Sequence, residues 1–253
     1  MVIKGFQKVS LIDYPGKIAA VVFVAGCNFR CPYCHNRALV LKPDNLLTIP
    51  KKEIFEYLKK RKNLIEGVVL TGGEPTLQED LFDFVKKIKD LGLLVKLDTN
   101  GSNTSALLFE QSEKSKVPER SEGFLYSAVV NDRFDYVALD IKALLDRRYS
   151  ESIGLKNFDV SSILSSMKEL TNSRVDYELR TTVVPGLHSE KDLLDLGKQL
   201  SEIAPKAKWF LQNFEPKNCL DPELEKIKPY DMMFLENLLE KLRVYMPNVE
   251  LRG

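Results

Sequence analysis

Apolar runs of strand length alternate with amphipathic helical patterns along most of this 253-residue chain, and this alternation restricts its possible folds more than any other feature. The runs fall at 18–24, 68–70, 93–97, 136–141, 175–184 and 209–211. Between several of them, apolar residues recur at the spacing of a helix face, over 81–91, 193–203 and 235–242. Strands separated by helices form parallel sheets through βαβ units. The chain is therefore predicted to fold as a single α/β domain over residues 1–253, a partial (β/α)6 barrel with parallel strands inside and helices outside.

Two local patterns refine this prediction. Thr76 and Glu79 have the spacing of a capping box, which would start the helix over 81–91. Residues 112–123 are polar and lack an apolar period, so they predict an exposed inserted loop.

The charge balance and apolar patterning exclude several kinds of partner. The chain has 37 basic and 36 acidic residues, which argues against a broad nucleic-acid-binding surface. Its longest apolar run, 18–25, is too short to cross a membrane. Residues 1–9 lack the apolar core and cleavage site of a signal peptide. We therefore expect a cytoplasmic protein with no membrane or nucleic-acid partner.

Polar residues stand on or directly after the predicted strands. In a sheet of parallel strands the carboxyl ends meet at one edge, where functional residues gather. The candidates at this edge are Gly72, Gly73, Glu74, Asp98, Thr99, Asn100, Asp140, Lys142, Arg180 and Gln212, with Glu215 close behind. Glycines allow a close approach of backbone to a ligand that a side chain would block. Arg180 suits either a ligand carboxylate or a structural salt bridge.

Three of the four cysteines fall within eight residues, directly after the first predicted strand. Cys27, Cys31 and Cys34 have the spacing C-x3-C-x2-C. In a reducing compartment, clustered cysteines indicate metal or redox chemistry more often than disulfides. Three thiolate ligands would leave one iron of a four-iron cluster without a protein ligand and free to bind a substrate.

Three other interpretations of this segment deserve comparison. Cys31-x-x-Cys34 fits a dithiol redox motif, but that interpretation leaves Cys27 unexplained. With His35, the same pair matches a c-type haem attachment site, which requires export. Three cysteines and His35 would also suit a structural zinc site. On the ligands alone, a zinc-stabilised binding protein stays open.

The cysteine motif, with Tyr33 before its last cysteine, resembles the radical S-adenosylmethionine superfamily. Gly72-Gly73-Glu74 resembles that superfamily's second signature. Further similarity is to the activating enzymes of glycyl radical enzymes, above all those of anaerobic ribonucleoside-triphosphate reductase. It rests on segments 10–16, 34–36, 97–101, 140–142 and 180–186. The polar stretch at 112–123 departs from the family by its length.

The resemblance implies a [4Fe-4S] cluster on Cys27, Cys31 and Cys34, with S-adenosylmethionine on the fourth iron. The implied S-adenosylmethionine-binding residues are Tyr33, Gly72, Gly73, Glu74, Asn100, Asp140, Lys142, Arg180 and Gln212. Tyr33 is expected at the adenine and Glu74 at the methionine ammonium. Asp140 and Lys142 are expected at the ribose hydroxyls and the methionine carboxylate. A monovalent cation is a further possibility, held by Asp98, Thr99 and Asp140.

The implied reaction begins with one electron from a flavodoxin or ferredoxin-like reductant. It cleaves S-adenosylmethionine to methionine and a 5′-deoxyadenosyl radical, which removes a hydrogen atom from a glycine of the partner enzyme. The first candidate partner is anaerobic ribonucleoside-triphosphate reductase. The alternatives are activation of another glycyl radical enzyme, of the pyruvate formate-lyase type, and radical modification of a small molecule or tRNA. His188 and Cys219 have no partner that the sequence identifies.

Overall fold

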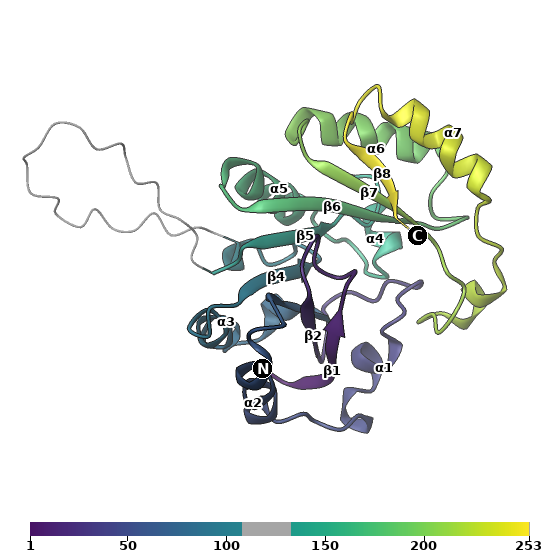
Figure 1. Cartoon of the computed structure of the whole chain (residues 1–253). Coiled ribbons are helices and arrows are strands. Elements are labelled where there is room, and N and C mark those ends of the chain that lie inside the picture. Colours follow the sequence, from purple (N-terminus) through teal and green to yellow (C-terminus); the bar gives the residue numbers. More distant parts are fainter. Residues whose placement is uncertain (108–132, 253) are drawn as a thin grey trace, which may run out of the picture.

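The computed structural model describes residues 1–107 and 133–252, so the loop predicted at 112–123 lies outside the described residues. Within them, one eight-stranded sheet runs in the order of the sequence. Its strands are β1 (Ile3–Ser10), β2 (Ala19–Val24), β3 (Gly67–Gly72), β4 (Leu94–Thr99), β5 (Tyr136–Asp140), β6 (Asp176–Val183), β7 (Lys208–Asn213) and β8 (Val249–Arg252). β1 is antiparallel to β2, and β2 to β8 are mutually parallel. The predicted α/β fold with a parallel sheet is confirmed, but the sheet has two strands more than predicted (Figure 1).

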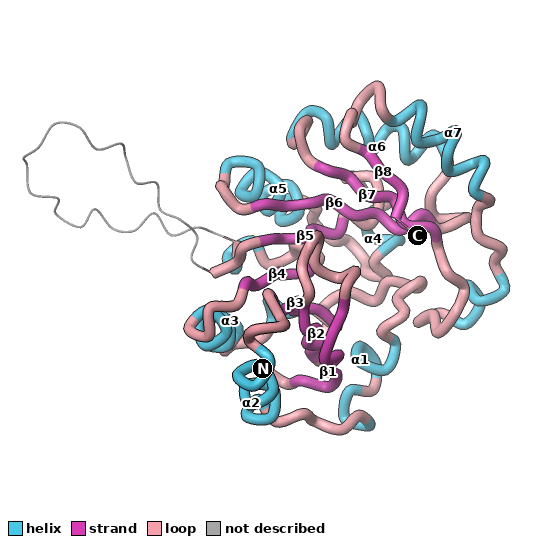
Figure 2. Tube along the Cα trace, in the orientation of Figure 1, coloured by secondary structure: helices cyan, strands magenta, loops and turns pink. Residues whose placement is uncertain are grey.

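The longer helices cover one face of this sheet, whereas the short α1 contributes Val40 to the cavity described below (Figures 1 and 2). The helices are α1 (Arg37–Leu41), α2 (Lys51–Arg61), α3 (Leu81–Lys89), α4 (Tyr149–Ser152), α5 (Ser161–Asn172), α6 (Glu190–Ile203) and α7 (Met232–Leu242). Short 3-10 turns lie at η1 (Pro43–Asn45), η2 (Pro75–Leu77), η3 (Thr104–Ala106) and η4 (Pro222–Lys226). No helix in the described ranges is long and apolar enough to cross a bilayer.

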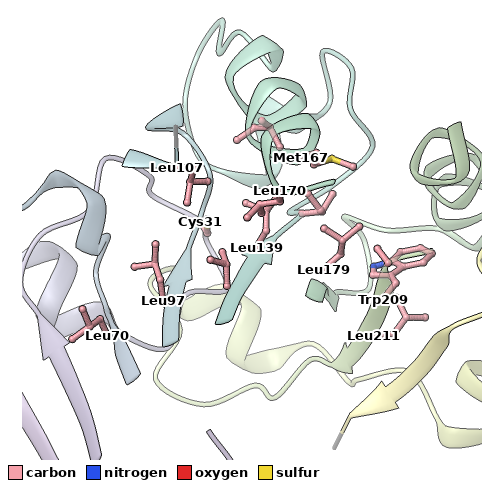
Figure 3. Packing of buried hydrophobic residues seen from close by; sticks show 14 of the residues in the cluster. Cys31, Leu70, Leu97, Leu107, Leu139, Met167, Leu170, Leu179, Trp209 and Leu211 are labelled. Atoms are coloured by element: carbon pink, nitrogen blue, oxygen red, sulfur yellow. The ribbon is translucent and has the colours of Figure 1, made fainter. Parts of the chain in front are cut away.

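Alternation along the strands separates the apolar core from a polar inner face. On β4, Leu97 is buried in the core between sheet and helices, where Leu139 and Leu179 join it (Figure 3). The neighbouring residues Lys96 and Asp98 point to the opposite face because successive side chains alternate in a strand. The helix-covered face therefore supplies the packing energy of the fold, and the inner face can carry charged residues.

The predicted capping box is wrong. Thr76 belongs to the short turn η2, and α3 begins only at Leu81, where the N-cap residue Asp80 makes no side-chain capping bond. The hydroxyl of Thr76 instead donates to Glu74 Oε1 at 2.6 Å. Thr76 bonds to Glu74 because a buried carboxylate requires hydrogen-bond donors from the protein. The start of α3 can instead be hydrated by solvent.

Candidate active site

The cysteine loop after β2 and the carboxyl ends of β3 to β7 enclose a cavity of about 270 Å³. All the residues proposed from the sequence for cluster, S-adenosylmethionine or cation binding line it: Cys27, Cys31, Tyr33, Cys34, Gly72, Gly73, Glu74, Asp98, Thr99, Asn100, Asp140, Lys142, Arg180 and Gln212. Glu215 is not among the lining residues. Parallel topology thus brings side chains that are far apart in the sequence to one place.

The three cysteines of the loop are free thiols on this cavity, Cys31 buried and the other two half-buried. Cys27 Sγ accepts hydrogen bonds from the Phe29 amide at 3.4 Å and from Asn100 Nδ2 at 3.8 Å. Burial raises the pKa of Cys31 to about 12, although Lys142 acts against that rise. The Cys31 thiol is therefore neutral at pH 7 until a metal displaces its proton.

His35 follows the last cysteine, and its ring lies 2.8 Å from the Glu215 carbonyl oxygen through Nε2. Among the residues described, no three histidine, cysteine, aspartate or glutamate side chains are placed to hold one metal ion. A four-iron cluster distributes its thiolate ligands over separate irons, so it does not require the sulfurs to meet at one point.

Gly72 and Gly73 are required by contacts with the backbone of the cysteine loop. A Cβ atom on Gly73 would lie 1.8 Å from the Gly26 carbonyl oxygen, and one on Gly72 would lie 2.5 Å from the Val24 nitrogen. The Gly73 amide donates to Val24 O at 2.9 Å. A close approach to a ligand is therefore not the only reason for these glycines. They also allow the Gly72-Gly73-Glu74 segment to pack against the backbone of the cysteine loop.

Glu74 is buried and holds the ends of β3 and β4 together. Its carboxylate accepts four hydrogen bonds, from the Thr76 amide and hydroxyl, the Thr99 hydroxyl at 2.7 Å and the Asn100 amide at 2.7 Å. Burial raises its pKa, and these hydrogen bonds oppose the rise. The carboxylate is satisfied by protein donors, so its structural role does not depend on a ligand ammonium.

Five charged side chains, four on β4, β5 and β6 and one just after β5, form a continuous network on the inner face. Asp98 pairs with Lys96 at 2.6 Å and with Arg180 at 3.2 Å. Asp140 pairs with Arg180 at 2.8 Å and with Lys142 at 2.9 Å. Burial alone would raise the pKa of Asp140, but Arg180 and Lys142 hold it at about 2. Both aspartates are therefore anionic, and each has two cationic partners. Arg180 forms structural salt bridges, which was one of the two roles predicted for it; the other was binding a ligand carboxylate.

His188 holds the backbone of Lys142, a contact that the sequence did not indicate. Its Nε2 lies 2.8 Å from the Lys142 carbonyl oxygen, and its Nδ1 accepts from the Val184 amide at 3.0 Å. The Lys142 amide donates to the Tyr149 hydroxyl at 3.2 Å. Burial lowers the pKa of His188, so the ring is neutral. Lys142 lies beyond the end of β5, so its backbone has no neighbouring strand to bond. The side chains of His188 and Tyr149 form hydrogen bonds with its carbonyl and amide groups instead.

Two residues that line the cavity, Tyr33 and Asn213, each carry a buried polar atom, the Tyr33 hydroxyl and Asn213 Oδ1, that lacks a hydrogen-bond partner within the described part of the chain. Buried polar atoms are rarely left unpaired, so this pair indicates a polar ligand. Asn213 was not among the residues predicted from the sequence. Its position next to Gln212 at the end of β7 was the available signal.

The sequence profile of the Radical SAM superfamily matches residues 21–197. The chain belongs to the radical SAM superfamily. It is 32% identical over 254 residues to a Methanocaldococcus jannaschii protein that is provisionally designated a glycyl-radical enzyme activating enzyme, covering 99% of this chain and 95% of that one. It is 31% identical over 198 residues to the pyruvate formate-lyase-activating enzyme of Streptococcus mutans, covering 76% and 69% respectively. The chain is thus a radical SAM enzyme homologous to glycyl-radical enzyme activating enzymes.

A solved structure shares the fold. Streptococcus suis SuiB bound to S-adenosylmethionine aligns with a TM-score of 0.60 at 17% identity. The alignment covers 92% of this chain and 52% of SuiB, so this chain spans about half the length of that protein. The match to the superfamily model excludes the alternative that this chain is a zinc-stabilised binding protein. The structural similarity to SuiB is not needed for that conclusion.

The donor set of the cavity fits the cofactors of a radical SAM enzyme. Three free thiols on one loop are suitable iron ligands, and they leave a cluster iron without a protein ligand. Lys142 and Arg180 offer cationic groups to a carboxylate, and the unpaired oxygens of Tyr33 and Asn213 offer partners to polar atoms of a nucleoside.

The substitution Gly73→Ala tests the contact between the two motifs. We expect it to lower the free energy of unfolding by at least about 2 kcal/mol, because the added Cβ meets backbone that cannot move independently. Gly197→Ala is the matched control, since the nearest atom that its Cβ would meet is the flexible end of the Leu242 side chain, at 2.9 Å, and the next, in the Trp209 side chain, lies at an ordinary contact distance of 3.6 Å. Chemical denaturation of both variants should leave the control within about 1 kcal/mol of the unaltered protein. An equally mild effect at Gly73 would contradict the contact.

Proposed function

We propose that this protein cleaves S-adenosylmethionine reductively at a [4Fe-4S] cluster and generates a glycyl radical on a partner enzyme. The observation that carries the proposal is the single cavity that holds the three-cysteine loop together with the polar ends of β3 to β7. Homology to glycyl-radical enzyme activating enzymes supports the same conclusion.

Cys27, Cys31 and Cys34 would hold the cluster. When bound, the cluster and S-adenosylmethionine supply one-electron cleavage of the sulfonium and a 5′-deoxyadenosyl radical. The residues of the chain bind and orient that chemistry. Tyr33 would contact the adenine. Its buried hydroxyl has no protein partner, so a ligand atom would satisfy it.

The remaining S-adenosylmethionine contacts follow from the charges on the cavity. Lys142 and Arg180 would attract the methionine carboxylate, while Asp140 would accept hydrogen bonds from the ribose hydroxyls. Gln212 and Asn213, at the end of β7, would contact the adenosine. Other predicted S-adenosylmethionine-binding positions are Gly72, Gly73, Glu74 and Asn100. A monovalent cation at Asp98, Thr99 and Asp140 stays a prediction, and its binding would compete with the ion pairs to Lys96, Arg180 and Lys142.

Two partner enzymes are supported by different observations. The motifs at 10–16 and 34–36 favour anaerobic ribonucleoside-triphosphate reductase. The relative from Streptococcus mutans, a pyruvate formate-lyase-activating enzyme, favours a lyase equally well. We retain the reductase as the first candidate and the lyase as the second.

Electron paramagnetic resonance decides between the partners. The reconstituted, reduced protein is mixed anaerobically with S-adenosylmethionine and each purified candidate, and the glycyl radical is counted by its spectrum. A radical on the reductase alone supports the first candidate, and a radical on the lyase alone supports the second. Cleavage of S-adenosylmethionine without a radical on either candidate would overturn both assignments.

A further inference from the structure

The chain just beyond the end of β5 is held in place mainly by side chains. Ile141 and Lys142 follow β5, and together they carry four backbone polar groups. The Ile141 amide donates to the Arg180 carbonyl oxygen at 2.8 Å and so extends the pairing with β6. The other three groups are bonded by side chains, those of Thr181, Tyr149 and His188. Every backbone polar group of this segment therefore has a partner, although the segment lies outside the sheet.

The three side chains that hold this segment are themselves fixed. All of them are almost completely buried. Trp209 Nε1 donates to Thr181 Oγ1 at 3.0 Å, and the Tyr149 ring stacks on Phe158 with 5.9 Å between the ring centroids. A functional group is held in one geometry by neighbours whose own rotamers are fixed by packing and hydrogen bonds. The segment at Lys142 has such neighbours.

The contacts of His188 define which ring nitrogen carries the proton. The Val184 amide is a donor, so Nδ1, which lies 3.0 Å from it, must be an acceptor. In the neutral ring the proton is then on Nε2, which donates to the Lys142 carbonyl oxygen at 2.8 Å. The His188 carbonyl oxygen accepts from the Tyr230 hydroxyl at 2.9 Å. His188 therefore has one tautomer and one orientation, and its single ring donor is directed to Lys142.

His188 acts on the active-site cavity from outside it. Lys142 lines the cavity, and so does Tyr33, whose ring lies edge-on to the His188 ring with 6.5 Å between the centroids. His188 is not among the lining residues. It cannot be a ligand of anything bound in the cavity, but it contacts two residues to which the proposed function assigns S-adenosylmethionine.

We propose that His188 is a positioning residue for S-adenosylmethionine, which acts through the backbone of Lys142 and shares this task with Tyr149. The inference rests on the proposed function, because that function places the methionine carboxylate at Lys142. A lysine side chain is flexible, and much of the cost of binding through it is the cost of ordering it. An anchored backbone limits the positions that the Lys142 ammonium can reach, and a displaced cation binds a carboxylate less well.

Two substitutions at His188 test the inference on the oxidised, cluster-loaded protein. His188→Asn keeps an acceptor near the place of Nδ1 but has no group at Nε2, so the Lys142 carbonyl loses its donor. His188→Gln places an amide nitrogen near Nε2 and restores that donor. Without a reductant there is no turnover, so calorimetry gives the dissociation constant for S-adenosylmethionine. We expect it to rise about tenfold in His188→Asn and less than about threefold in His188→Gln.

A second pair of variants leaves His188 unchanged. Tyr149→Phe removes the hydroxyl that accepts from the Lys142 amide and keeps the ring on Phe158. Tyr136→Phe is the matched control, because its hydroxyl donates to the buried Glu178 at 2.8 Å and Tyr136 lies at the opposite end of β5, outside the cavity lining. Both variants should lower the urea midpoint, but only Tyr149→Phe should weaken S-adenosylmethionine binding. Equal losses of binding in the two variants would contradict the inference.

The substitution Lys142→Met separates positioning from folding. It removes the ammonium and keeps the backbone carbonyl that His188 bonds. In this background His188→Asn should still lower the urea midpoint, but most of its effect on the dissociation constant should disappear, because the two residues act as one unit.

Two results would overturn the positioning role. One is a loss of binding from His188→Asn that is equally large with and without the Lys142 ammonium, and the other is a lower urea midpoint with unchanged binding. Lys142→Met that binds S-adenosylmethionine as tightly as the unaltered protein would overturn the role together with the assignment of Lys142. If the unaltered protein binds S-adenosylmethionine but forms no glycyl radical on any partner, the proposed function fails instead, while the binding measurements still judge His188.

Discussion

Replacing Cys31 with alanine is expected to abolish reductive cleavage of S-adenosylmethionine and to lower bound iron and sulfide sharply. Cys31 is the most buried of the three cysteines on the cavity, 7% exposed, and its loss leaves two thiolates for the cluster. The measurements are iron and sulfide content after anaerobic reconstitution, and 5′-deoxyadenosine formed with dithionite as reductant.

The fourth cysteine provides the control for this experiment. Cys219 is completely buried but does not line the active-site cavity, and its thiol donates to the backbone oxygens of Glu215 and Lys217. Cys219→Ala should therefore keep the cluster and the cleavage activity. A variant at Cys31 with full iron content, or one at Cys219 without a cluster, would contradict the ligand assignment.

Replacing Arg180 with leucine is expected to lower the free energy of unfolding at pH 7 by about 3–5 kcal/mol, the usual cost of breaking a buried ion pair. The guanidinium is the only group that contacts both Asp98 and Asp140 among the ion pairs of the described chain. Its removal leaves two buried carboxylates with one cation each. Urea denaturation measures the loss. Arg148 pairs with Asp146 and Asp192, and its side chain is 42% exposed, so it is the matched position for a control substitution.

The loss at Arg180 should depend on pH in a defined direction. In the unaltered protein the pKa of Asp140 is lowered from 3.8 to about 2. Such a carboxylate contributes stability above its unfolded pKa and loses it as the pH falls through the folded value. Without Arg180 the carboxylates protonate at higher pH, so the difference between the proteins should shrink as the pH falls toward 4. Arg148→Leu should cost under about 1 kcal/mol at any of these pH values. A difference at Arg180 that is constant with pH would contradict the electrostatic account.

Most of the site could be predicted because the chemistry and the topology leave local marks in the sequence. The spacing of Cys27, Cys31 and Cys34 is visible without a structure. Asp98 and Asp140 stand out as charges that interrupt or end apolar runs, and the parallel topology implies that such residues meet. The same alternation predicted six of the eight strands.

The rest depends on contacts that have no local signature. Half of the eight residues of β1 are polar and the strand is only partly buried, while β8 has four residues. His188 contacts Lys142 across 46 positions, so its role follows only from the folded chain. The need for Gly73 comes from the Gly26 carbonyl, which no motif indicates.

The central claim is that the cysteine loop holds a four-iron cluster with one iron open to S-adenosylmethionine. Its most direct test is the electron paramagnetic resonance spectrum of the reconstituted, dithionite-reduced protein, recorded before and after addition of S-adenosylmethionine. The account predicts the signal of a reduced [4Fe-4S] cluster whose g values change when S-adenosylmethionine binds. A colourless protein that contains zinc and no iron, or a cluster signal that S-adenosylmethionine leaves unchanged, would contradict it.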